Sequence, residues 1–207
     1  MEDKFGGNRA IINGASFLGR DVQTQMLVSN GATTQHWSRI ENRDCPFVME
    51  ERKIPLGTDE IDAILADAPF SVRVSGTISS LAGQLAQFPS AMVEDVMVLA
   101  ARFSRLTGKE LLRVRIEGVT TNACKKVHAD YTDVRLITTY AGPGTEYSPH
   151  GDANCCLTRM PIGAVGLFKG SLFGEGHEPC LHRSPPIEGT DAKRLVLVID
   201  TPRRETN

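Results

Sequence analysis

The sequence has no hydrophobic stretch that approaches the roughly 20 apolar residues needed to cross a bilayer. Its first residues, Met1 to Gly7, also lack the apolar segment of a secretory signal peptide. Charge of neither sign is in excess, because the net charge is -2 and the pI is about 6.2. Nucleic-acid binding usually requires a basic surface. We therefore expect a cytoplasmic protein with neither a membrane nor a nucleic acid as its partner.

Cysteine is scarce, and the five cysteines are odd in number. In a chain without a secretion signal this indicates reduced thiols and not a disulfide framework. The sequence also lacks the Gly-x-Ser-x-Gly motif, the P-loop, and a Gly-x-Gly-x-x-Gly motif entering a helix. These absences argue against the common serine hydrolases, P-loop nucleotide hydrolases and dinucleotide-binding enzymes.

A chain of 207 residues with 41% hydrophobic and 23% charged residues can fold around one core. We expect one structural domain made of two parts. Residues 1–108 are predicted to form an N-terminal arm with supporting helices. Residues 109–207 are predicted to form a β core on which that arm packs.

Three helices are predicted in the second half of the arm. Thr58 is suited to cap the first, which Pro69 ends. The second begins near Thr77, and Pro89 stops it. The third begins at Ser90, carries apolar residues at helical spacing, and is followed by Gly108, a favourable residue just past a helix end.

After Gly108 the apolar pattern changes to the alternation that is typical of half-buried strands. Residues 112–116, 134–140, 163–168 and 194–200 are the predicted strands, and Arg9–Ile12 and Pro46–Met49 are shorter candidates. Helices first and short strands afterwards indicate an α+β fold, with a closed or two-sheet β architecture in the C-terminal half.

The strongest chemical pattern is His128-Ala129-Asp130 followed by His182 and then Arg194. Residues two apart in a strand point to the same face, so His128 and Asp130 can aim at one point. Two imidazoles and one carboxylate form a facial set that leaves open positions on iron(II). The planar guanidinium of Arg194 is suited to bind a carboxylate in bidentate fashion. Chance occurrence of the triplet and a turn-capping role for His182 are the simpler explanations.

The order of motifs around this set resembles the 2-oxoglutarate- and iron-dependent oxygenases, especially their prolyl-hydroxylase-like branch. The matching motifs are, in chain order, His128-Ala129-Asp130, Arg135 to Tyr140, Gly142-Pro143-Gly144-Thr145, Pro161-Ile162-Gly163 to Phe168, His182, Gly189 and Arg194. The chain is similar, more closely still, to a bacterial group, domain-of-unknown-function family 1826. That resemblance is carried by Cys124 to Asp130, Thr139 to Glu146 and His182 to Pro186.

The resemblance implies a double-stranded β-helix, a jelly-roll or cupin-like barrel, with an N-terminal helical arm. It implies Fe(II) on His128, Asp130 and His182, and 2-oxoglutarate on Arg194, assisted by Tyr140 or Thr138. The implied reaction is dioxygen-dependent hydroxylation coupled to decarboxylation of 2-oxoglutarate. No motif in the chain identifies the primary substrate, which is a small molecule or a protein.

A zinc site is the alternative interpretation. Cys124 and Cys180 lie near the two histidines in the sequence, and thiolates favour zinc over an open iron site. The same ligands with one or both cysteines describe a non-catalytic zinc protein, in keeping with the association of this group with bacterial zinc homeostasis. Ordinary core packing is the simpler role for both cysteines.

Several further residues have more than one role that fits the sequence. Tyr140 and Thr138 share one strand face and have either a co-substrate role or a packing role. Arg135 has the opposite parity and is expected to support the barrel or form a salt bridge. Lys193 is the alternative to Arg194 as the anion-binding residue. A second triplet at residues 150–152 contains glycine and follows a proline, so we interpret it as a turn.

Overall fold

The computed structural model describes residues 36–149, 151 and 156–202. The strand predicted at Arg9–Ile12 lies outside the described residues. So do His150 and Asp152 of the second triplet, and Cys155.

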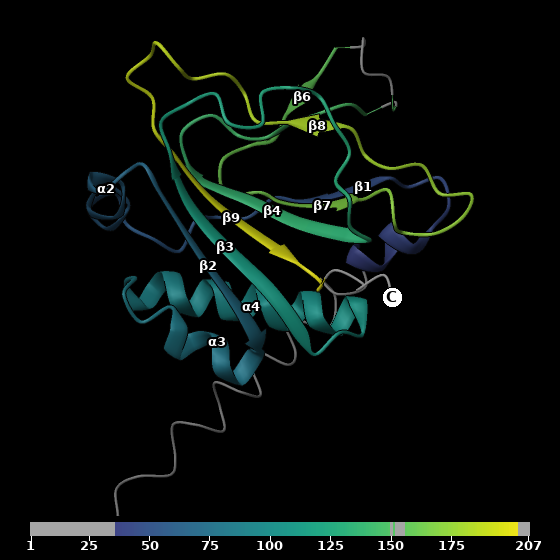
Figure 1. Ribbon diagram of the computed structural model, residues 1–207, viewed down its shortest axis with the longest axis horizontal. Coiled ribbons are helices and arrows are strands. Elements are labelled where there is room, and N and C mark those ends of the chain that lie inside the picture. The colour runs from purple at the N-terminus through teal and green to yellow at the C-terminus, as the bar shows by residue number, and fades with distance from the viewer. Residues whose placement is uncertain (1–35, 150, 152–155, 203–207) are drawn as a thin grey trace, which may run out of the picture.

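Two antiparallel sheets form the body of the protein (Figure 1). The larger sheet has six strands in the order β1-β7-β4-β9-β3-β2 and the smaller has three in the order β6-β5-β8. The strands of the large sheet are β1 (Phe47–Glu50), β2 (Phe70–Thr77), β3 (Leu111–Val119), β4 (Val134–Ala141), β7 (Val165–Lys169) and β9 (Arg194–Asp200). Those of the small sheet are β5 (Glu146–Tyr147), β6 (Thr158–Arg159) and β8 (His182–Arg183).

The helices are few and precede most of the strands, as the sequence predicts for an α+β fold. They are the 3-10 helix η1 (Ser38–Glu41), α2 (Thr58–Ala66), α3 (Ile78–Gln84) and α4 (Ser90–Thr107). Figure 1 shows α3 and α4 against one face of the large sheet, with the small sheet on its other side. Among the described residues, no helix is long and apolar enough to cross a membrane.

The predicted helices are confirmed, with corrections at one helix start and one helix end. Helix α3 ends at Gln84, before Pro89. Gly57 and not Thr58 caps α2, and its backbone N–H donates to the Glu60 carboxylate at 2.9 Å. At the end of α4, Gly108 adopts a φ of 64°, which is the left-handed conformation that glycine favours.

Strand β2 was not predicted, although Val72 and Val74 alternate with polar residues as a half-buried strand requires. It pairs along its whole length with β3, more than thirty residues later in the chain. Both β1 and β2 precede residue 108, so the first part of the chain contributes the two edge strands of the large sheet.

The two faces of the large sheet are buried against different partners. On β4, Leu136 and Tyr140 belong to the main core shared with the helices. Ile137 has the opposite parity and packs with Phe168 and Val196 in a second cluster on the other face. The alternation of side chains along each strand therefore separates a structural face from a face that meets the small sheet.

A polar network lies within the helix-facing core. The hydroxyl of Tyr140 donates to Asp95 Oδ2 at 2.5 Å, and Arg52 donates to both oxygens of the same carboxylate at 2.5 and 2.9 Å. Burial, together with the Asp95 charge, raises the pKa of Tyr140 well above its usual value. Tyr140 is therefore a neutral donor that ties β4 to α4.

Tyr140→Phe removes this buried hydrogen bond without changing the packing of the ring. We expect the free energy of unfolding to fall by about 1–2 kcal/mol, because the acceptor is charged and desolvated. Urea denaturation measures the change. Tyr131→Phe makes the same chemical change on a side chain that is 72% exposed and should have almost no effect. Equal effects of the two substitutions would contradict a buried role for Tyr140.

Candidate metal centre

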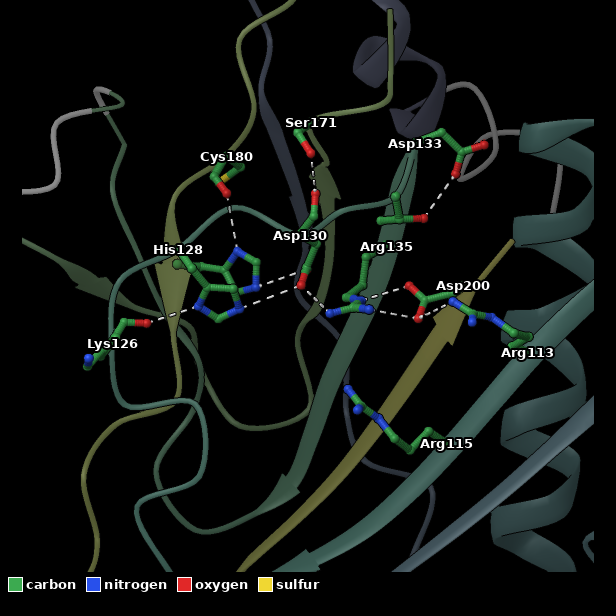
Figure 2. Close-up of polar contacts among 12 residues, drawn as sticks. Arg113, Arg115, Lys126, His128, Asp130, Asp133, Arg135, Ser171, Cys180 and Asp200 are labelled. Atoms are coloured by element: carbon green, nitrogen blue, oxygen red, sulfur yellow. Dashed lines mark hydrogen bonds and ion pairs between the residues drawn. The ribbon is translucent and has the colours of Figure 1, made fainter. Parts of the chain in front are cut away.

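His128 and Asp130 lie close together (Figure 2), and His182 of strand β8 joins them. One ligand atom from each lies within 4.8 Å of the others. The Nε2 atom of His182 is 3.1 Å from Asp130 Oδ2, and the Nε2 atom of His128 is 3.6 Å from Asp130 Oδ1. Asp130 and His182 are buried, whereas His128 is partly exposed.

The backbone holds the two histidines side by side. His128 N–H donates to His182 O at 3.0 Å, and His182 N–H donates to His128 O at 2.9 Å. This isolated antiparallel bridge, and not the regular strand expected for residues 128–130, aligns the two side chains. The ring of Phe168 packs against the His182 ring with centroids 4.7 Å apart and limits its rotation.

Asp130 lies on a loop that is fixed by the segment after β7. Its carbonyl oxygen accepts hydrogen bonds from Ser171 N at 2.8 Å and from Ser171 Oγ at 3.1 Å. A Cβ atom at Gly170 would lie 2.1 Å from the carbonyl oxygen of Thr132 and 2.8 Å from that of Asp130. Only glycine allows the two loops to approach this closely.

The orientation of both imidazoles leaves their Nε2 atoms available. His128 Nδ1 lies 2.9 Å from Lys126 O, and His182 Nδ1 lies 3.2 Å from Cys180 O. A carbonyl oxygen only accepts hydrogen bonds, so each Nδ1 carries the proton in the neutral ring. The Nε2 lone pairs then face Asp130, which is the arrangement that metal-binding histidines adopt.

The Asp130 carboxylate is ionised and incompletely satisfied. Burial by itself raises the pKa of Asp130, but in the metal-free site hydrogen bonds from His128 and His182, formed when their Nε2 atoms are protonated, and the Arg135 charge outweigh it and hold that pKa well below its usual range. Arg135 donates a hydrogen bond to Oδ1. Oδ2 is buried and, while His182 Nε2 at 3.1 Å is unprotonated, has no hydrogen-bond donor among the described residues. A buried anionic oxygen without a donor, beside two imidazole lone pairs, fits a divalent cation.

The pKa of His128 is raised, chiefly by the neighbouring Asp130 carboxylate. A proton on this imidazole therefore competes with a metal for the same lone pair.

Arg194 lies in the wall of the pocket that contains the two histidines. Its Nε donates to Pro143 O at 2.7 Å, one terminal nitrogen donates to Ser184 Oγ at 2.8 Å, and the other lies 3.5 Å from Thr145 Oγ1. Burial lowers the pKa of Arg194 to about 10, so it remains a cation at neutral pH. Within the described part of the chain, no carboxylate pairs with it.

Tyr140 and Thr138 do not line this pocket, whereas Arg135 does. Tyr140 binds Asp95 in the core, and Thr138 Oγ1 donates to Gly163 O at 3.3 Å. The expected co-substrate role of this strand face is therefore wrong, because even-numbered residues of β4 face the helices. Lys193 also points away, since its Nζ donates to Leu65 O at 3.0 Å.

Neither cysteine joins the ligand group found among the described residues. Cys124 is exposed and lines the same pocket as His128. Cys180 is buried, and burial together with the Asp130 charge raises the pKa of its thiol to about 12. In the metal-free site this thiol therefore holds its proton.

Asp200 was missed in the sequence because it belongs to no motif. It accepts two hydrogen bonds from Arg135, at 2.7 and 2.8 Å, and so fixes the arginine that contacts Asp130 (Figure 2). Arg135 and Asp200 are direct neighbours across β4 and β9. Sixty-five residues separate them in sequence, so no local spacing predicts the pair.

The family model described as "Protein of unknown function (DUF1826)" matches residues 53–200. The chain belongs to this family. A comparison with curated protein sequences gave no significant match.

Solved structures match this chain at low sequence identity, and one with a TM-score of 0.50 shares its general fold. The dioxygenase for auxin oxidation 1 from Arabidopsis thaliana, solved with 2-oxoglutarate, is 9% identical and has a TM-score of 0.50. That match covers 86% of this chain and 91% of the plant protein. A full-length Neurospora crassa protein, solved in complex with alpha-KG, is 13% identical with a TM-score of 0.47, over 89% of this chain and 84% of the fungal one.

Asp130→Asn keeps the shape of the side chain and removes its charge. We expect the affinity for cobalt(II), a spectroscopic probe of divalent-metal sites, to fall by about tenfold or more because the carboxylate is a direct ligand. Calorimetric titration of metal-free protein measures it. Asp191→Asn makes the same change at an exposed position and should bind cobalt(II) like the unmodified protein. Unchanged affinity in Asp130→Asn would exclude this centre.

Proposed function

We propose that the chain is an Fe(II)- and 2-oxoglutarate-dependent oxygenase that hydroxylates its substrate on a double-stranded β-helix. The observation that carries the proposal is the buried, ionised Asp130 with an oxygen that lacks a donor, beside two imidazoles whose Nδ1 atoms are already held. The facing six-stranded and three-stranded antiparallel sheets support the β-helix. Pairing of β1 with β7 and of β2 with β3 supports one structural domain built from residues 1–108 and 109–207.

The buried Arg194 side chain is the second observation that supports the proposal. A buried guanidinium without a carboxylate partner is costly, and a bound carboxylate offsets that cost. We assign it to the distal carboxylate of 2-oxoglutarate. Ser184 and Thr145, not Tyr140 and Thr138, are the hydroxyls next to it. Because both accept from Arg194, their own O–H groups are free to donate to the same carboxylate.

When bound, iron(II) and 2-oxoglutarate would let dioxygen act as the oxidant, with one oxygen atom going to the substrate as a hydroxyl group and the other to the co-substrate as it loses carbon dioxide. The chain contributes position and environment. His128, His182 and Asp130 bind the metal through a facial set and leave positions for other ligands. Arg135 keeps Asp130 ionised and oriented. Ile137, Val196 and Val198 form an apolar wall that excludes water from the pocket.

Anaerobic titration of metal-free protein with iron(II) and then 2-oxoglutarate, followed by visible absorption, tests the proposal. We expect a metal-to-ligand charge-transfer band only when both are present. Arg194→Ala should weaken 2-oxoglutarate binding by about tenfold or more, because a charge-assisted pair is lost. Lys193→Ala removes the adjacent charge, which faces helix α2, and should leave binding intact. Absence of the band in folded unmodified protein would refute the co-substrate assignment.

A non-catalytic zinc site is the second candidate, and the presence of Cys124 in the same pocket favours it. The oxygenase assignment predicts that Cys124→Ser and Cys180→Ser each leave metal affinity within about twofold, because neither sulfur is a ligand. Competition with a zinc chelator measures the affinity. A strong loss in either variant would transfer the assignment to the zinc protein.

A further inference from the structure

Three arginines lie together beyond the metal centre, on the edge strand β2 of the large sheet and on its neighbour β3. Arg73 on β2 is directly opposite Arg115 on β3, and Arg113 lies two residues from Arg115 on the same face. Like charges at directly opposed positions of antiparallel strands destabilise a sheet. This cluster, defined as Arg73, Arg113 and Arg115, therefore requires compensation by negative charge.

The protein's own carboxylates compensate it only in part. Asp200 is bound in bidentate fashion by Arg135, and its nearest contact with Arg113 is 3.6 Å. Glu117 is shared, with contacts of 3.6 Å to Arg115 and 3.8 Å to Arg73. These ion pairs are long and partly exposed, so each stabilises little. The cluster has an excess of positive charge in a chain whose net charge is -2.

Two of the arginines retain unused donors. Arg113 Nε is buried and has no hydrogen-bond partner among the described residues. Arg115 contacts Glu117 at a distance longer than a hydrogen bond, and Figure 2 shows it extended toward Arg135 without a marked contact to the residues drawn. Such donors are suited to an oxygen-rich anion that binds guanidinium groups in bidentate fashion.

The cluster opens onto a hollow of about 220 Å³ that also contains Ser75, Arg135 and Asp200. Arg115 and Arg135 line both this hollow and the pocket of the metal centre. The hollow therefore adjoins the candidate active site, with the side chains of Arg115 and Arg135 at the boundary. Its volume is below that of most drug-sized ligand pockets, so it suits a single small anionic group.

We propose that Arg73, Arg113 and Arg115 bind an oxyanion, a carboxylate or a phosphate, and that the primary substrate carries this group. The anion site stands on the geometry alone. Its assignment to the substrate rests on the proposed oxygenase function. An anionic end bound by the cluster places the remainder of the substrate toward Arg115 and Arg135, and so toward the metal centre.

The anion site is tested on full-length, metal-free protein by calorimetric titration with inorganic phosphate and, separately, with acetate. We expect saturable binding of at least one probe. The double variant Arg113→Gln, Arg115→Gln should bind the probe at least about tenfold more weakly, because two charged donors are lost. Arg105→Gln removes an exposed charge on α4, away from the sheet, and should bind like the unmodified protein. A preference for phosphate or for acetate identifies the anion.

Two further variants separate the possible outcomes. Because Arg194 is itself proposed to bind a carboxylate, the titrations are repeated in Arg194→Gln protein, which should keep the phosphate or acetate binding that depends on Arg113 and Arg115. Complete loss of binding in Arg194→Gln would place the anion at Arg194 and overturn the proposal. The double variant Arg113→Lys, Arg115→Lys keeps the charge, and its affinity for the probe should lie between those of the unmodified protein and the glutamine variant. It tests the proposal even if the glutamine variant does not fold. Absence of binding by both probes in unmodified protein also overturns it.

The two proposals fail separately. Phosphate or acetate binding that depends on Arg113 and Arg115, in protein without the iron and 2-oxoglutarate absorption band, supports the anion site and refutes the oxygenase. The band without such binding supports the oxygenase and refutes an anionic substrate group at this cluster.

Discussion

The site depends on the two faces of the large sheet being buried against different partners. Side chains alternate along each strand, and one face is covered by α3 and α4 while the other meets the small sheet. On β9, Leu195, Leu197 and Ile199 pack in the main core. Arg194, Val196 and Val198 of the same strand line the pocket. One strand therefore stabilises the fold and builds the site without conflict between the two tasks.

On the pocket face, charge is concentrated where burial opposes it. Asp130 remains ionised because two histidines and Arg135 surround it, and Arg135 is in turn fixed by Asp200. Arg135 on β4 binds the carboxylates of both Asp130 and Asp200. The arginines of β2 and β3 are therefore left with weak partners. The same electrostatic arrangement would favour a cation beside Asp130 and an anion beside Arg113 and Arg115.

Much of the architecture was predictable because its signals are local. Helical spacing before Gly108 and alternation after it gave the α+β class, and the predicted helix starting at Ser90 matches α4. Strand β2 was missed although its alternation is visible, because it lies between two helices and its partner β3 is distant in the sequence. The roles of Tyr140 and Thr138 were misassigned because alternation tells which residues share a face but not which face is the pocket.

The sequence by itself determined which residue types are available to bind a metal and a carboxylate, and in what order: His128, Asp130, His182 and Arg194. Their spacing along the chain is a covalent property, so it can be read directly. Only the tertiary structure decided that the two histidines bond through their backbones, that Arg135 contacts Asp130, and that Arg73 opposes Arg115. Those relations depend on strand register between distant segments, which is fixed by the packing of the whole sheet.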